Sequence, residues 1–435
     1  MFEPDVLVIG GGPAGVAAAT ELADMGFTVL LAEQRDRLGG AIHRAYVGEG
    51  PSPLSIVGRH RRNWQRLQQK MIQAGSRIAT QCETVFLGID GDARVLLDDR
   101  RAGRVISLQP QAVVLALGAL ERVSPRPGWE LPGVTTAGGM QVQLKETGEA
   151  PKGPILVAGT GPLPLALAAQ LAAAGNPPVA VLERGQPFRA AFAHIGATID
   201  GLRSWSNLTE GLGYGARLLR AGVPYRTGCT VTAIEAVPEG LRVTSRHANG
   251  TTSHHHVRHL ALHDGLASND TGLPTQSIAG IFVVRAGDCR EVLGAEGAAN
   301  DGRRAAQRVA KQLGRPSRED AFDARLLAAR RMQHAIGMLF DAPALSPTPD
   351  TVICRCEGLR RADLESLQGV QSAREIRLVG RFGMGACQGR FCTRTVQEIA
   401  AEAGMNLEPH ELGDTTLRWP LRPVAVASLA AWTDS

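Results

Sequence analysis

Four of the seven cysteines lie close together near the end of the 435-residue sequence. Cys354 and Cys356 stand in "CRCEG", and Cys387 and Cys392 stand in "GACQGRFC". Thiols grouped in this way could form disulfides, bind zinc, bind an iron–sulfur cluster or only be buried. Structural zinc sites use cysteine pairs with two to four intervening residues, and Cys-x-Cys does not match that spacing. Four thiolates are what an all-cysteine [2Fe–2S] cluster requires, so the quartet favours this cluster over zinc.

The residues around the quartet suit a negatively charged cluster. The glycines of "GMGACQGRFC" let the backbone curl so that its N–H groups can point at sulfur. The stretch "TRTVQEIAAEAG" predicts a helix that starts just after Cys392, and the positive end of a helix dipole favours a thiolate. Six arginines could offset the charge of a cluster, although arginine is common throughout the chain: Arg355, Arg360, Arg361, Arg381, Arg390 and Arg394.

A glycine-rich turn near the N-terminus predicts a nucleotide site. In "DVLVIGGGPAGVAAATELADMGFTVLLAEQ" a strand, a glycine turn, a helix and a second strand follow one another. The glycines of G-x-G-x-x-G allow a tight turn, a close approach of backbone to a pyrophosphate and close packing of helix on strand. Glu33 ends the second strand, where it can accept a hydrogen bond from a ribose hydroxyl. The phosphates would lie at the positive end of the helix, beside Gly10, Gly12, Pro13, Ala14 and Gly15.

The same plan recurs in "GPILVAGTGPLPLALAAQLAAAGNPPVAVLER", where Gly159 and Gly161 take the first two glycine positions. The third position is Pro164, which a helix tolerates in its first turn but which removes a backbone donor near the phosphates. Glu183 could hold a ribose and Arg184 could hold a 2′-phosphate, so these residues do not choose between NAD and NADP. We expect a bound but unreactive nucleotide, or an empty structural site, rather than productive hydride exchange.

Other residues of suitable chemistry are less informative. No Cys-x-x-Cys motif lies near either glycine turn, which argues against disulfide-reductase chemistry of the thioredoxin-reductase kind. The histidines of "SHHHVRH" (253–259) lie in a predicted hairpin with the turn Asn249-Gly250, and we expect a solvated hairpin rather than a metal site. His43 follows a Gly-Gly turn and could approach a flavin. Three isolated cysteines are expected to be small buried residues: Cys82, Cys229 and Cys289.

Composition limits the class of protein. The apolar fraction of 44% allows a sizeable core. Aromatic residues make up only 4%, and the basic residues behind the net charge of +5 form no block, so no nucleic-acid partner is expected. The sequence opens directly into a strand and has no apolar run near the ~20 residues that a membrane helix needs. We therefore expect a cytoplasmic protein with no transmembrane segment. Stable disulfides are rare in the cytoplasm.

The stretch "EQRDRLGG", with Glu33 followed by Gly39 and Gly40, resembles the extended FAD fingerprint of flavoproteins that have two dinucleotide-binding domains. "AVVLALGALER" (112–122), which contains Gly118, is similar to the point where such chains cross into the second domain. "GIFVVRAGDC" (280–289), which ends with Gly287, Asp288 and a cysteine, is similar to the strand that returns to the flavin. The resemblance implies FAD at the first turn, with Asp288 accepting from a ribityl hydroxyl. A plain turn or N-cap role for Asp288 is the alternative.

These motifs imply an α/β fold, namely a two-dinucleotide-binding-domain flavoprotein in which an NAD-type domain is inserted in a Rossmann-like FAD domain. A small helical [2Fe–2S] domain would follow it. The tail, 418–432, is expected to pack on the chain's own surface or on a partner. The expected segments are a discontinuous FAD-binding domain at 1–120 and 261–341, a second nucleotide-binding-like domain at 121–260, a proline-rich linker at 342–350, and the cluster domain with its tail at 351–435.

The quartet resembles the bacterioferritin-associated-ferredoxin-like [2Fe–2S] domain. A flavoprotein body followed by this domain resembles the α (A) subunit of heteromeric FAD-dependent amino-acid and opine dehydrogenases, a family that includes opine oxidases, D-hydroxyproline and proline dehydrogenases and hydrogen cyanide synthase. In that family the second glycine turn likewise lacks its third glycine.

That resemblance implies a division of labour. A partner flavoprotein of the D-amino-acid-oxidase type would oxidise the C–N bond, and this chain would pass electrons from its FAD and cluster to an external acceptor. An FMN at the interface between subunits and a small third subunit are further expectations from the family. Only three tyrosines are available for a substrate pocket, and no catalytic residue is assigned. Two alternatives stay open: a self-sufficient NAD(P)H-dependent reductase, and a scaffold subunit that keeps its cofactors for folding.

Overall fold

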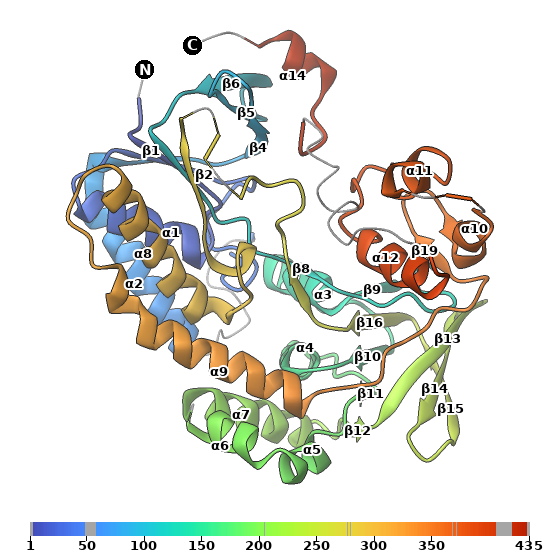
Figure 1. Ribbon diagram of the computed structural model, residues 1–435. Helices are drawn as coiled ribbons and strands as arrows, with labels where there is room; N and C mark the ends of the chain where they lie inside the picture. Colours follow the sequence, from blue (N-terminus) through green and yellow to red (C-terminus); the bar gives the residue numbers. More distant parts are fainter. Residues whose placement is uncertain are drawn as a thin grey trace.

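The computed structural model describes residues 3–47, 58–203, 205–275, 277–278, 280–367, 369–370, 372–405 and 420–432. Figure 1 shows two bodies built on β-sheets, a long helix that runs between them, and a small helical body beside the second sheet. Within the described residues, no helix combines the length and apolar character that crossing a membrane requires.

The first sheet is parallel, with the strand order β18-β7-β1-β2-β3. Alternate residues of β1 face opposite sides: Val6 and Val8 join the core under α1, α2 and α8, while Leu7 and Ile9 join the core under the antiparallel sheet β4-β5-β6. Both faces are therefore covered, as is usual for parallel sheets. The bounds are β1 (Val6–Ile9), α1 (Pro13–Asp24), β2 (Val29–Ala32), α2 (Gly58–Ala74), β3 (Ile78–Gln81), β4 (Thr84–Ile89), β5 (Val95–Asp99), β6 (Arg104–Leu108), β7 (Ala112–Leu115), β18 (Phe282–Arg285) and α8 (Gly294–Gln312).

The second sheet repeats this plan with the parallel order β12-β11-β10-β16-β9. Ile155 and Val157 face α3, α4 and α7, whereas Leu156 and Ala158 face the antiparallel sheet β13-β14-β15. The bounds are β9 (Val134–Thr136), α3 (Ala137–Thr147), β10 (Ile155–Gly159), α4 (Pro162–Ala173), β11 (Ala180–Glu183), α5 (Pro187–Ala193), α6 (Ile195–Arg203), α7 (Trp205–Arg220), β12 (Tyr225–Thr227), β13 (Cys229–Val237), β14 (Gly240–His247), β15 (Thr252–Val257) and β16 (His259–His263).

Two short antiparallel strands connect the bodies. The chain leaves the first sheet through β8 (Ala119–Glu121) and returns through β17 (Leu266–Ser268), which pairs with β8. Strand β16 continues through residue 263, so the second sheet extends past the boundary expected at residue 260.

A long helix spans the two bodies. Helix α9 (Asp323–Leu339) packs against α8 on the first body and against α5 and α6 on the second (Figure 1). Among the described residues, 3₁₀ turns follow α2 at η1 (Gly75–Arg77), precede α8 at η2 (Gly287–Cys289) and precede α9 at η3 (Glu319–Phe322).

The cysteine module is a small body with its own core, in which Ile353, Phe382 and Ile399 are buried. It docks beside the second sheet, where the Trp129 indole N–H donates to the Val352 carbonyl at 2.6 Å. Its elements are β19 (Val352–Cys354), β20 (Leu359–Arg360), α10 (Arg361–Glu365), α11 (Ala373–Leu378) and α12 (Thr393–Glu402).

The tail returns to the first body. Helix α14 (Val426–Ala430) lies against β6, and Leu429 packs on the core between β4, β5 and β6. The described part of the tail thus packs on the chain's own surface, which is one of the two outcomes expected from the sequence.

Candidate functional site

The first glycine turn is tightly built except at its middle glycine. Gly10 has a φ of +105°, and a Cβ on Gly15 would lie 1.8 Å from the Gly10 carbonyl oxygen, so neither position admits a side chain. At Gly12 the nearest atom to such a Cβ is the Gly40 Cα at 3.7 Å. The turn therefore keeps open the position where a pyrophosphate must approach the backbone.

Helix α1 packs closely against α8 and the turn before it because two glycines there have no side chain. Pro13 begins α1, and a Cβ on Gly287 would meet the Ala14 Cβ at 2.5 Å. A Cβ on Gly302 would meet the Ala14 carbonyl oxygen at 2.0 Å. The role of Gly302 was not found from the sequence because it lies within an ordinary helical pattern, far along the chain from the turn that it contacts.

The Glu33 carboxylate lies beneath the turn. It is buried and accepts hydrogen bonds from the Gly11 N–H at 2.6 Å and the Arg35 N–H at 2.9 Å. The Gly39 N–H donates to the Gly11 carbonyl at 2.9 Å. The "GGGPAG" turn and the "EQRDRLGG" stretch are thus in contact with each other, as their resemblance to one extended fingerprint indicates.

The returning strand brings a second set of groups to the same end of the sheet. Gly118 has a φ of +71° with open space around it. The Asp288 carboxylate accepts from the Leu293 N–H at 2.9 Å just before α8 begins, and burial raises its pKa. Asp288 therefore lies in a turn, which is one of the alternatives to a ribityl contact that the sequence offered, whereas the N-cap residue of α8 is Leu293.

Asp301 was missed by sequence reasoning. Its fully buried carboxylate accepts from the Gly287 N–H at 2.8 Å, from two nitrogens of Arg290 and from Arg304 Nε at 2.9 Å. Two guanidinium groups and a backbone donor satisfy this charge inside the protein. It anchors the turn that carries Gly287 to helix α8, but the residues around it in the sequence gave no sign of burial.

His43 lies close to the Gly39-Gly40 turn. Its backbone N–H donates to the Gly39 carbonyl at 3.2 Å. Its ring stacks on Trp64 with centroids 4.9 Å apart. Burial and the neighbouring His60 and Lys145 lower the pKa of His43 to about 4, so the ring is neutral at pH 7. Its Nδ1 has no hydrogen-bond partner among the described residues.

The second glycine turn has a similar acid beneath it. A Cβ on Gly159 would lie 1.8 Å from the His263 carbonyl oxygen, whereas Gly161 has open space around it. The Glu183 carboxylate accepts from the N–H groups of Gly161 at 3.1 Å and Gly185 at 2.8 Å. Burial raises the pKa of Glu183 to about 7, despite these hydrogen bonds.

The chain's own linker lies over this second turn. Thr160 Oγ1 donates to the Phe340 carbonyl at 2.6 Å, and a Cβ on Gly185 would lie 3.0 Å from the same oxygen. Arg184 donates to the Pro343 carbonyl and pairs with Asp264 at 2.6 Å. These contacts of the buried Arg184 guanidinium argue against the expectation that it could hold a 2′-phosphate.

The four clustered cysteines converge as two contacting pairs. Cys354 lies beside Cys392, and Cys356 lies beside Cys387. The neighbouring Cys392 thiol, partly opposed by burial, lowers the pKa of Cys354, and backbone N–H groups act in the same direction. That same contact raises the pKa of Cys392. All seven cysteines fall in the described part of the chain, and each is a free thiol.

Backbone N–H groups lie close to these sulfurs. Those of Cys356, Glu357 and Gly383 lower the pKa of Cys354, and those of Gly389 and Phe391 partly oppose the rise in the pKa of Cys387 that burial causes. Helix α12 starts at Thr393, directly after Cys392. In the parts of the chain that the structure describes, no three His, Cys, Asp or Glu side chains converge as the ligands of one metal ion.

Five of the six arginines near the quartet have side chains that contact residues other than the loop around Cys387. Arg355 lies over the Trp129 ring with its Cζ 5.0 Å from the centroid. We call residues 383–392 the cysteine loop. Within the described residues, Arg390 is the one of the six arginines whose side chain contacts this loop, and its Nη1 donates to the Cys387 carbonyl at 2.9 Å. The remaining four are paired with carboxylates: Arg360 with Asp350, Arg361 with Glu365 and Glu402, Arg381 with Glu357, and Arg394 with Glu398.

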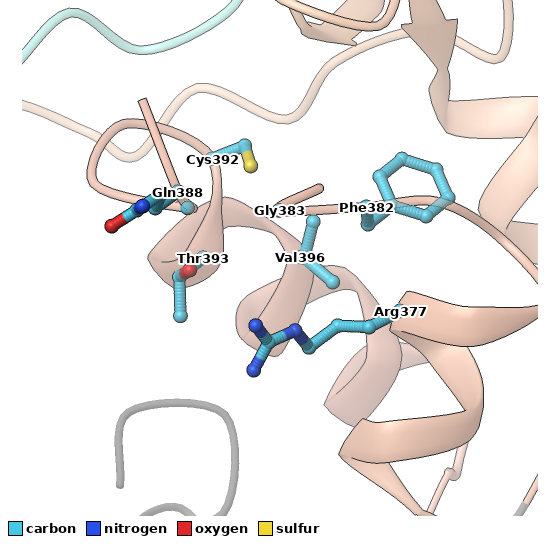
Figure 2. A pocket seen from close by; sticks show the side chains of 8 residues that line it. Arg377, Phe382, Gly383, Gln388, Cys392, Thr393 and Val396 are labelled. Carbon is cyan, nitrogen blue, oxygen red and sulfur yellow. The ribbon is translucent and has the colours of Figure 1, made fainter. Parts of the chain in front are cut away.

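A pocket lies on the inner side of the cysteine loop. Figure 2 shows the Arg377 side chain extending toward Thr393 and Val396, with the Cys392 sulfur near the far end of the pocket. Arg377 is buried, and sequence reasoning missed it because it stands among the other arginines of an amphipathic helix.

Comparison with known proteins agrees with this geometry. The pattern of the family described as pyridine nucleotide-disulphide oxidoreductase matches residues 4–286, which include both glycine turns. The chain belongs to this family. A pyridine nucleotide-disulphide oxidoreductase fold supports FAD binding, and the expectation of an oxidoreductase flavoprotein is confirmed.

Relatives of this pyridine nucleotide-disulphide oxidoreductase match it over nearly its whole length. It is 32% identical to the A subunit of opine oxidase from Agrobacterium tumefaciens (strain Ach5), over 98% of this chain and 91% of that protein. It is 29% identical to hydrogen cyanide synthase subunit HcnB of Pseudomonas aeruginosa, over 96% of each chain. L-proline dehydrogenase from P. horikoshii has a similar fold, with a TM-score of 0.65 and 18% identity over 99% of this chain and 80% of that one.

Proposed function

We propose that the chain is the electron-transferring FAD and [2Fe–2S] subunit of a heteromeric dehydrogenase that oxidises the C–N bond of an amino acid or opine. The observation that carries the proposal is the convergence of two cysteine pairs in the same chain as a flavoprotein fold. When bound, the cluster would supply one-electron chemistry beside the two-electron chemistry of the flavin.

The donor set fits a binuclear cluster better than a single ion. A [2Fe–2S] cluster has two irons that together take four thiolates, and the quartet is divided into two pairs, Cys354 with Cys392 and Cys356 with Cys387. A structural zinc ion takes four ligands around one point, usually from cysteine pairs with two to four intervening residues, and Cys354-x-Cys356 does not have that spacing.

The FAD would lie on the first glycine turn. Gly12 and Gly40 leave room for its pyrophosphate, while Gly10 and Gly15 hold the turn closed around α1. The flavin end would lie near Gly118 and the turn that carries Gly287 and Asp288.

The second turn is less suited to NAD or NADP. The carbonyl of Phe340 and the side chain of Arg184 bring the linker onto the strand ends where the adenosine of such a cofactor would bind. These contacts favour electron transfer between flavin and cluster over NAD(P)H oxidation at this site.

The substrate would be oxidised on another chain. Two relatives are named as subunits, of opine oxidase and of hydrogen cyanide synthase. We therefore propose a partner flavoprotein of the D-amino-acid-oxidase type. Further parts of the complex would be an FMN at the interface, an external electron acceptor and a small third subunit.

The test is cofactor analysis of the chain co-expressed with its partner. We expect FAD, and iron and acid-labile sulfide in equal amounts, with an EPR signal that appears on reduction by dithionite. Cys387→Ser should lose the iron and the turnover while the complex still assembles. Cys229→Ser removes a buried thiol of the second body and serves as the control, which should keep both. Zinc in place of iron, or full turnover in assembled Cys387→Ser, would contradict the proposal.

A further inference from the structure

Arg390 links the cysteine loop to the tail. Its Nη1 donates to the Cys387 carbonyl at 2.9 Å, and its Nη2 donates to the Leu421 carbonyl at 2.6 Å. Gln388 in the same loop donates from Nε2 to the Pro420 carbonyl at 3.2 Å. One guanidinium group thus joins two segments that are more than thirty residues apart in the sequence.

The same tail residues are fixed to the first body. The Leu421 N–H donates to the Leu87 carbonyl of β4 at 2.8 Å, and the Leu421 side chain is buried in the core of the first sheet. Arg422 Nη2 contacts Asn269 Oδ1 at 3.4 Å. Residues 420–422 therefore contact the cysteine loop on one side and the first body on the other.

Asn269 extends this series of contacts to the residues near which the flavin would lie. Its N–H donates to the Gly118 carbonyl and its Nδ2 to the Leu117 carbonyl, both at 3.1 Å. The Cys289 thiol, next to Asp288, donates to the Asn269 carbonyl at 3.6 Å. A continuous series of contacts thus runs from Cys387 to the turns that carry Gly118 and Asp288.

We propose that Arg390 is a positioning residue, which with residues 420–422 holds the cysteine loop at a fixed place against the flavin-binding body. We further infer that its guanidinium raises the reduction potential of the cluster. Both parts rest on the proposed function.

The charge effect has a simple physical basis. One-electron reduction adds a negative charge to a cluster, and a nearby cation stabilises the reduced form. Arg390 is partly buried. Its Nη1 and Nη2 donate to backbone carbonyls and its Nε has no partner, so no carboxylate among the described residues pairs with it. Arg394, two residues beyond Cys392, has a 62% exposed side chain and pairs with Glu398, so water and that carboxylate screen it.

The experiment compares three variants of the full chain, co-expressed with its partner, by dithionite titration followed by EPR. Arg390→Gln should lower the ratio of reduced to oxidised cluster about tenfold at a fixed potential, which is 59 mV for a one-electron couple. Arg390→Lys keeps the charge and should stay within about twofold of the native protein. Arg394→Gln loses the same formal charge and should also stay within about twofold.

Amide hydrogen exchange separates the positioning role from the charge. Lysine cannot replace the guanidinium fork that reaches two carbonyls at once, so exchange should rise at 387–392 and at 420–422 in both Arg390 variants but not in Arg394→Gln. A shift in Arg390→Gln no larger than in Arg394→Gln, or unchanged exchange in Arg390→Lys, would overturn the inference. A native complex that contains no iron would instead refute the proposed function, so the two failures are distinguishable.

Discussion

Replacing Glu183 by glutamine should make the protein less stable in mild acid but more stable above neutral pH. Glu183 is 1% exposed, and burial raises the pKa of its carboxyl group from 4.5 to about 7. Because the folded state favours the protonated form, the stabilisation is fully present below pH 4.5 and is lost as the pH rises through 7.

The size of the effect follows from that pKa. Each pH unit between the ordinary and the folded pKa corresponds to about 1.4 kcal/mol, so the native protein should lose about 3 kcal/mol between pH 4.5 and 7. Glutamine does not titrate there and loses nothing. It has one acceptor oxygen, whereas both oxygens of the Glu183 carboxyl group, protonated or not, can accept from Gly161 and Gly185. The lost acceptor should cost about 1 kcal/mol at every pH.

Thermal unfolding of both proteins from pH 4 to 8 tests this reasoning. The variant should unfold at a lower temperature at pH 4 and at a higher one at pH 8, with the two curves crossing at about pH 5. Glu235→Gln is a suitable control because that carboxylate is half-exposed and pairs with Arg242, so its curve should not cross. A Glu183→Gln curve that runs parallel to the native curve would refute a buried carboxyl of raised pKa.

Four further substitutions follow from the geometry. Gly15→Ala should give little folded protein in a solubility assay, because its Cβ would lie 1.8 Å from a backbone oxygen, whereas Gly12→Ala should fold but lose flavin absorbance. Asp301→Ala should lower the free energy of unfolding in urea by about 3–5 kcal/mol, because two guanidinium groups lose their buried partner; a loss below about 1 kcal/mol would contradict this. Trp129→Phe removes the 2.6 Å hydrogen bond to the cysteine module and should speed proteolysis within 342–350 without changing the flavin content.

Local patterns in the sequence predicted the local structure well. The apolar run Val6–Ile9 is β1, the helix after Cys392 begins at Thr393, and the histidine stretch forms the last strand of a hairpin with alternate exposure. Each of these depends on residues a few positions apart, whose spacing alone fixes which face they occupy.

Contacts between distant segments could not be predicted in the same way. Arg184 was assigned to a ligand because nothing near it in the sequence shows that Asp264 and the Pro343 carbonyl would reach it first. Arginines around the quartet looked equivalent, yet of those six it is Arg390 that contacts the loop within the described residues. Such choices depend on how the bodies dock, and single-sequence periodicity carries no information about that.

The strand order of the first sheet has a consequence for biosynthesis. Strand β18 pairs with β7, but residues 116–281 must be translated between them. At typical elongation rates of about 5–20 residues per second, the edge of β7 stays unpaired for about 10–30 s. Helix α8, which covers α1, emerges later still. The nascent chain therefore presents an open strand edge and an uncovered apolar helix while the second sheet, encoded without interruption from β9 to β16, can already close.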